Sequence, residues 1–226
     1  MKKKLTVIGL VLLACAVLYG IWWNLPGVRM VRLSQKSYEL LRAIPAVRLQ
    51  YSSREWDPDT DMWYTEESPV NTYWISGEDR CVLGTHDNRL YWEGTAFDIA
   101  PGGGWREDPD YSGINLFLDK SWSQLTWDAP GTVQRTEQGT AVRFVGPAGW
   151  CCTGYQGTAV VFHFDRKEDL TAVELEYIHY SHAGVSETNI TSRHSGFYQI
   201  TSLDEALVRQ ELETVANRVL ERVYGR

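Results

Sequence analysis

The spacing of hydrophobic and polar positions changes three times along the 226-residue chain. Residues 5–23 carry no charged side chain and follow three lysines at positions 2–4. As a helix this run would be about 28 Å long, close to the hydrocarbon thickness of a bilayer. The pattern predicts a transmembrane helix and a single-pass location in the cell membrane. Residues 1–27 would be the anchor, and residues 28–226 would form one domain on the extracytoplasmic side.

Two other fates of this first segment stay open. Residues 12–15 resemble the lipobox of bacterial lipoproteins, in which Cys15 would carry the lipid. Residues 14–16 have the small side chains of a secretory cleavage site. Trp22 and Trp23, which end the apolar run, favour an uncleaved anchor at the membrane interface. All three fates predict that the remaining chain lies outside the cytoplasm.

Beyond the anchor, helical spacing gives way to alternation. Residues 28–44 repeat apolar positions at helical spacing, and Pro45 ends the pattern. Short runs with the spacing of strands follow, separated by turn residues. The expected strands are residues 46–54, 62–66, 70–76, 80–85, 89–97, 132–135, 140–145, 158–164, 170–180 and 186–200.

The end of the chain returns to helical spacing. Residues 203–224 carry a stripe of Leu and Val, with Ser202 as the expected N-cap and Glu205 completing a capping box. The order of elements predicts an α+β fold: a large curved antiparallel sheet of about ten strands, half-barrel-like, with an N-terminal helix and a long C-terminal helix. The two helices would cover one face of the sheet or close the half-barrel. Such an arrangement would leave space for a ligand between helix and sheet.

One hairpin in this pattern carries a resemblance to a known family. The Phe-His-Phe-Asp run at residues 162–165 and the Leu-Thr-Ala-Val run at residues 170–173 follow an N-terminal helix and a series of strands. This order resembles the lipoprotein-carrier and sigma-regulator half-barrel superfamily of bacterial envelope proteins over residues 28–200. The resemblance implies a protein that holds an acyl chain or acts as an envelope sensor, and it assigns no site residue.

Charge and motifs narrow the classes of function. The net charge is −7, and residues 49–226 carry twenty-eight acidic against fourteen basic side chains, so no nucleic-acid partner is expected. Nucleophile elbows, phosphate-binding loops, dinucleotide fingerprints and zinc-protease motifs are absent from the sequence. No cofactor, metal site or catalytic residue is therefore predicted.

Three cysteines in the expected domain predict a disulfide, because an oxidising compartment favours paired thiols. Adjacent cysteines can bridge only through a strained ring, so Cys81 is expected to pair with Cys151 or Cys152. A bridge between Cys151 and Cys152, or free thiols, are the alternatives. A leftover thiol would be either reactive or simply buried.

Two glycine-rich loops give the strongest site signal. Trp105 and Tyr111 belong to the first loop, and Trp150 and Tyr155 to the second. Rings carried on such backbone could form a lid or a stacking platform for a lipid, a sugar or an aromatic ligand. The alternative is that the rings plug the open end of the sheet as part of the core.

Three functions from different classes follow. The first is a membrane-anchored extracytoplasmic binding or sensor module that holds an apolar or amphiphilic ligand, a lipid or a glycan, between sheet and helix. The second is a structural envelope protein whose acidic surface binds a basic protein partner. The third is a hydrolase that uses loop carboxylates for acid–base catalysis, drawn from Asp98, Glu107, Asp108 and Asp110.

Overall fold

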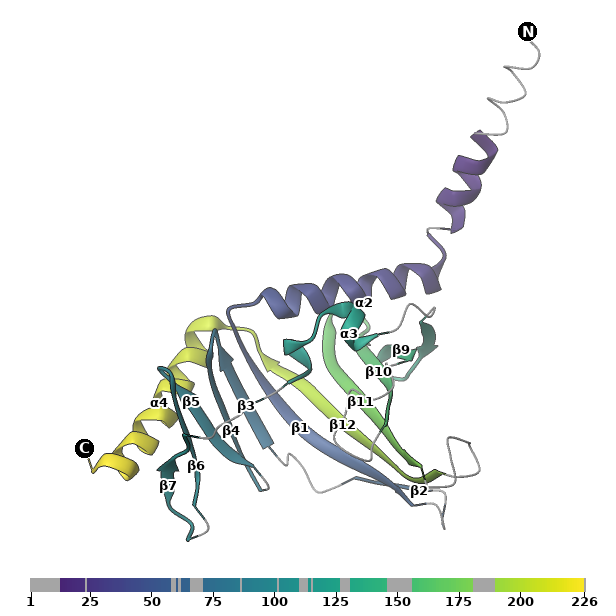
Figure 1. The fold of residues 1–226 in the computed structure, drawn as a ribbon. Helices are drawn as coiled ribbons and strands as arrows, with labels where there is room; N and C mark the ends of the chain where they lie inside the picture. Colours follow the sequence, from purple (N-terminus) through teal and green to yellow (C-terminus); the bar gives the residue numbers. More distant parts are fainter. Residues whose placement is uncertain are drawn as a thin grey trace, which may run out of the picture.

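An antiparallel sheet of twelve strands forms most of the protein in the computed structural model (Figure 1). The structure describes residues 13–22, 24–57, 60, 62–65, 71–85, 87–100, 102–109, 114, 116–126, 131–145, 156–180 and 190–225. The strands are β1 (Ala46–Asp57), β2 (Met62–Thr65), β3 (Asn71–Ser76), β4 (Asp79–Gly84), β5 (Asn88–Trp92), β6 (Thr95–Ile99), β7 (Trp105–Glu107), β8 (Thr132–Arg135), β9 (Gly139–Val145), β10 (Gln156–Asp165), β11 (Leu170–Tyr180) and β12 (Ile190–Ser202). Their order is β7-β6-β5-β4-β3-β1-β12-β11-β10-β9-β8, and β2 pairs with β1 outside this order.

The sheet consists of two meanders that meet at its centre. The chain leaves β1 outward through β3 to β7, and it then returns inward from β8 to β12. The first and last strands pair antiparallel, from Arg48 opposite Ser202 to Trp56 opposite Arg193. Consecutive strands β7 and β8 therefore lie at opposite edges, and the sheet stays open. The segment that connects them has to cross the sheet.

Helix α2 (Pro26–Ala43) covers one face of the sheet at the half that contains β8 and β9 (Figure 1). It begins with Pro26 at its first turn and ends where Ile44 turns extended before Pro45. Its buried side chains recur every three or four residues, which is the spacing of one helical face. These buried residues are Met30, Ser34, Tyr38 and Leu41.

The crossing segment packs under α2 and fills the space between helix and sheet. It contains the 3-10 helix η1 (Phe117–Asp119) and the short helix α3 (Trp122–Leu125). The Trp122 ring stacks on Phe162 of β10 with centroids 5.4 Å apart. The hydroxyl of Tyr38 lies 2.7 Å from the carbonyl oxygen of Phe117 and 2.6 Å from that of Lys120. Aromatic side chains thus occupy the space in which the sequence predicted a ligand cavity beside the N-terminal helix.

Helix α4 (Glu205–Tyr224) packs on the opposite face, at the other half of the sheet (Figure 1). Two pairs of consecutive residues, one in β3 and one in β4, show that the two helices cover opposite faces. Tyr73 and Val82 belong to the core under α2, whereas Trp74 and Cys81 pack in the cluster under α4. Successive residues of a strand point to opposite faces, so each helix has its own face and its own core. The α4 core contains Cys81, Leu90, Phe97, Leu212, Ala216 and Val219.

The predicted fold class was wrong. We expected a curved, half-barrel-like sheet with two helices that cover one of its faces or close the half-barrel. The structure is mostly one open antiparallel sheet with helices on opposite faces. The physical reason is that β3 and β4 are apolar on both sides, so each side needs a cover.

The predicted transmembrane helix and single-pass membrane location are contradicted as well. In the part of the chain that the structure describes, no helix is both long enough and apolar enough to cross a membrane. Residues 13–22 are helical.

Candidate functional site

A groove of about 410 Å³ lies between α4 and the outer strands of the sheet. The strands β4, β5, β6 and β7 each contribute one side chain, and α4 contributes four. The strand side is mostly apolar, whereas the helix side combines valines with arginines. The lining residues are Leu83, Asn88, Ile99, Trp105, Val215, Arg218, Val219 and Arg222.

Trp105, a residue predicted from the first glycine-rich loop, lies in this groove at the start of β7. It stands opposite Ile99 of β6 and is half-buried against the α4 core. A tight turn positions it, because Ala100 N–H donates to Gly104 O over 2.8 Å and Gly103 N–H donates to Ala100 O over 2.8 Å. Gly103 has a φ of 85°, which other residues adopt only with strain.

Arg218 and Arg222 bring two positive charges to the helix side of the groove. They are four residues apart on α4, so their side chains lie on the same face, and both residues are exposed. Among the described residues, neither guanidinium forms an ion pair within 4 Å. Like charges at this spacing destabilise a helix by about 0.2–0.5 kcal/mol. A bound anion would remove this repulsion.

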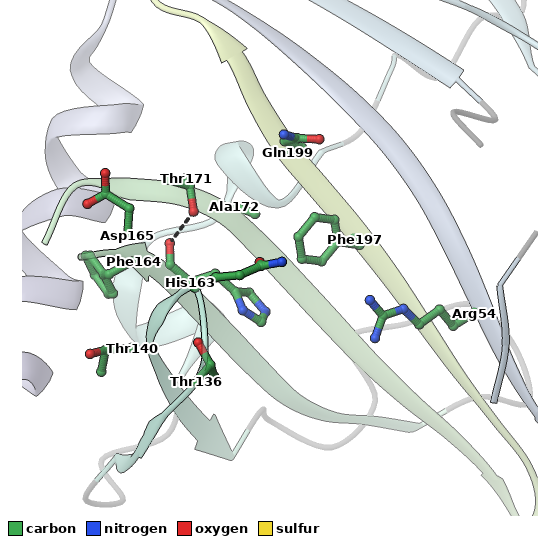
Figure 2. A pocket seen from close by; sticks show the side chains of 11 residues that line it. Arg54, Thr136, Thr140, His163, Phe164, Asp165, Thr171, Ala172, Phe197 and Gln199 are labelled. Atoms are coloured by element: carbon green, nitrogen blue, oxygen red, sulfur yellow. Dashed lines mark hydrogen bonds between the residues drawn. The ribbon is translucent and has the colours of Figure 1, made fainter. Parts of the chain in front are cut away.

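A second, polar cleft of about 500 Å³ lies on the same face of the sheet as α4, over β10, β11 and β12, which α4 does not cover. Figure 2 shows Phe197 and Arg54 approaching it from the centre of the sheet, with His163 facing them from β10. Thr136 and Thr140 border it from the β8–β9 hairpin. The cleft is lined by Arg54, Thr136, Gln138, Thr140, His163, Phe164, Asp165, Thr171, Ala172, Phe197 and Gln199.

The carboxylate of Glu174 contacts His163, one of the side chains that line this cleft. Glu174 lies 2.9 Å through Oε2 from Nε2 of His163, and its Oε1 accepts a hydrogen bond from Ser195 Oγ. Burial of the carboxylate raises the pKa of Glu174. The hydrogen bonds from His163 and Ser195, with the charges of His163 and Arg54, outweigh burial and bring that pKa below its usual range. Glu174 is therefore a stable anion that fixes the His163 ring.

Phe197 is an aromatic surface in otherwise polar surroundings. The His163 ring meets it edge to face with centroids 5.2 Å apart, and the guanidinium carbon of Arg54 lies 5.9 Å from its centroid. The strand register places Phe197 between its neighbours. In β1 it stands opposite Ser52, and in β11 it stands opposite Glu174. All of these side chains lie on the face opposite the core under α2.

The other residues predicted for a site are only partly placed. Tyr111, Trp150 and Tyr155 lie outside the described residues, and so do Cys151 and Cys152. Cys81 is fully buried in the α4 core, and its burial, with a smaller effect of Asp87, raises the pKa of the thiol to about 12. Among the described residues Cys81 has no disulfide partner. Its pairing with Cys151 or Cys152 stays a prediction.

Two of the four carboxylates that the hydrolase alternative invoked, Asp98 and Glu107, have structural partners. Asp98 of β6 accepts hydrogen bonds from Arg106 of β7 over 2.8 and 3.1 Å, and these bonds lower its pKa. Glu107 accepts a hydrogen bond from the Tyr224 hydroxyl of α4. Asp110 lies outside the described residues. Asp98 thus connects β6 to β7, and Glu107 connects β7 to α4. These structural contacts argue against the use of the two carboxylates as an acid–base pair.

Sequence reasoning missed the arginine pair and the polar cleft. The spacing of Arg218 and Arg222 was readable from a helical projection of residues 203–224, but only the sheet order shows which elements face that side. The cleft had a signal in the alternation of β11, where Ala172, Glu174 and Glu176 share one face. Its other walls come from segments far apart in sequence.

Comparison with known proteins adds no assignment: no protein-family model and no curated protein matched the chain.

Proposed function

We propose that the protein is a binding module that holds an amphiphilic anion, such as a fatty acid, in the groove between α4 and the sheet. The observation that carries this proposal is the pair Arg218 and Arg222 beside an apolar wall, with no carboxylate paired to either among the described residues. A carboxylate headgroup would lie between the two guanidinium groups. The acyl chain would pack along Trp105 and Ile99.

The chemistry of the two walls supports a ligand with two unlike ends. Apolar surface gains about 25 cal/mol for each Å² that leaves water, and hydrogen bonds to a charged group contribute about 1.5–3 kcal/mol. A volume of about 410 Å³ lies within the usual range for small-molecule sites. With a net charge of −7, the whole chain does not attract anions, so recognition would depend on the local arginine pair.

The groove lies between the sheet and the C-terminal helix. The N-terminal helix α2 is an unfavourable place, since Tyr38, Phe117 and Trp122 fill the space beneath it. The groove is not enclosed, so a ligand can enter without unfolding a strand.

Calorimetric titration with dodecanoate tests this function. Arg218→Gln and Arg222→Gln are each expected to weaken binding about ten-fold, because each removes a charge-assisted hydrogen bond. Trp105→Ala should weaken dodecanoate and neutral dodecanol alike, since it removes apolar surface. Arg209→Gln is the matched control, because it removes an exposed charge from the same helix outside the groove. Equal affinity for dodecanoate and dodecanol, or binding unaffected by both arginine variants, would contradict the proposal.

A further inference from the structure

The polar cleft of Figure 2 is a second site, separate from the groove under α4. Both lie on the same face of the sheet, but the cleft lies over β10 to β12, where no helix covers the strands. Its walls share no residue with those of the groove. Its chemistry also differs, because hydroxyl and amide side chains replace the valines.

The charges around the cleft balance within the protein. Arg54 lies over Phe197 and lowers the pKa of Glu174, so the two opposite charges are near neighbours. Asp165 accepts backbone N–H bonds from Lys167 and Asp169 over 2.8 and 2.9 Å at the hairpin turn. A cationic ligand would meet Arg54, and an anionic ligand would meet the carboxylates of Glu174 and Asp165. The electrostatics therefore favour an uncharged ligand.

Several uncharged polar side chains around the cleft have unused hydrogen-bonding capacity. Among the described residues, the side chains of Gln138, Thr140 and Gln199 form no hydrogen bond. Each amide offers two donors and an acceptor, and each hydroxyl offers both functions. A ligand that both donates and accepts at several positions matches this set. Hydroxyl groups have that property.

Phe197 supplies a flat apolar surface for one face of the ligand. Its neighbours His163 and Arg54 leave it half-buried at the floor of the cleft. A ligand with apolar C–H groups on one face and hydroxyls around its edge would use both the ring and the polar rim. We propose that this cleft binds a neutral saccharide of one or two rings, stacked on Phe197 and hydrogen-bonded by Gln199, Gln138 and Thr140.

The full-length chain and a panel of neutral disaccharides test this proposal by calorimetry and ligand-observed NMR. The probes are maltose, cellobiose, lactose and chitobiose. At least one is expected to saturate the protein below about 10 mM, a range typical of weak small-ligand sites. Phe197→Ala should weaken that binding about ten-fold, and Phe197→Leu should weaken it as well, because Leu keeps apolar volume but removes the flat ring.

Three comparisons test whether the binding is specific to this cleft and to a neutral saccharide. Gln199→Ala should reduce affinity, whereas Gln134→Ala on β8, outside the cleft, should leave it unchanged. A disaccharide with a uronic acid in place of one neutral ring should bind more weakly than its neutral counterpart. Arg218→Gln should not alter saccharide binding, so failure here is distinguishable from failure of the anion groove. Absence of binding by the whole panel, equal binding by Phe197→Ala, or preference for the uronic acid would overturn the proposal.

Discussion

The indole N–H of Trp74 donates a hydrogen bond to Oε2 of Glu211 over 2.9 Å, which connects β3 to α4. The same carboxylate receives Arg48 Nη1 from β1 over 2.7 and 2.9 Å. One side chain of α4 is thereby held by two strands. The same helix also forms one wall of the groove that contains Trp105 and Arg218.

Glu211→Ala should therefore lower the free energy of unfolding by about 1–3 kcal/mol, since it leaves the indole N–H and the guanidinium without their acceptor. Urea denaturation at pH 7 measures the change. Glu213→Ala, an exposed change on the same helix, is the control and should alter stability by less than about 0.5 kcal/mol. Equal stability of the two variants would mean that the Glu211 contacts contribute little.

Tyr38→Phe tests the attachment of the crossing segment to α2. The change leaves the carbonyl oxygens of Phe117 and Lys120 without the hydroxyl that bonds them, inside a fully packed core. We expect a loss of about 1–2 kcal/mol in the free energy of unfolding, and faster amide hydrogen exchange in residues 116–126. Tyr64→Phe removes an exposed hydroxyl and serves as the control. Unchanged exchange in residues 116–126 would contradict the expected role of the hydroxyl.

Glu174 predicts a pH dependence of stability. Its pKa in the folded state is lower than in the unfolded state, so its ionised form stabilises the fold above the unfolded value of about 4.3. This contribution is lost as the pH falls through the folded pKa. Glu174→Gln should lower the free energy of unfolding by about 2 kcal/mol at pH 7, and by progressively less below about pH 4. Urea denaturation at several pH values from 7 to 3 measures the loss of stability and its dependence on pH. Glu137→Gln, a change at an exposed residue, is the control. A difference independent of pH would refute the assignment.

Cys81 should resist alkylation in the folded protein, because it is fully buried and its thiol pKa is raised to about 12. Cys15 is exposed and gives an internal reference in the same chain. Peptide mapping after a pulse of iodoacetamide measures both rates. Modification of Cys81 as fast as Cys15 would contradict the burial. Peptide mapping without a reductant tests the predicted disulfide between Cys81 and either Cys151 or Cys152.

The two long helices α2 and α4 were predictable because their signals are local, whereas the short helices η1 and α3 were not predicted. The helix expected over residues 203–224 is confirmed as Glu205–Tyr224, although its N-cap is Asp204 rather than Ser202. Asp204 accepts from Leu207 N–H over 3.1 Å, whereas Ser202 Oγ accepts from Asp204 N–H over 3.2 Å. Two polar residues, Ser202 and Asp204, lie two positions apart near the start of the helix, and the sequence does not rank them as caps.

Strand boundaries and faces were less predictable. The single strand expected over residues 89–97 is two strands, β5 and β6, joined by a turn in which Glu93 and Gly94 have φ values of 48° and 80°. Glutamate seldom adopts such an angle, so the turn carries only the glycine as a signal. The face that each helix covers depends on sheet order, which pairs strands from opposite ends of the chain. Trp105 was found from local sequence, while Arg218 needed that order. The resemblance to the half-barrel superfamily stays a prediction.

The pairing of β1 with β12 has a consequence for how the chain acquires its structure. Arg48 and Thr201, which share a hydrogen bond at this seam, are 153 residues apart in sequence. Contacts of such long range close late and slow folding, because the loop entropy is lost before the strands can pair. Until residues 190–202 have been synthesised, one edge of β1 has no partner and can pair with another molecule. During translation this unpaired edge is therefore open to pairing with the wrong strand.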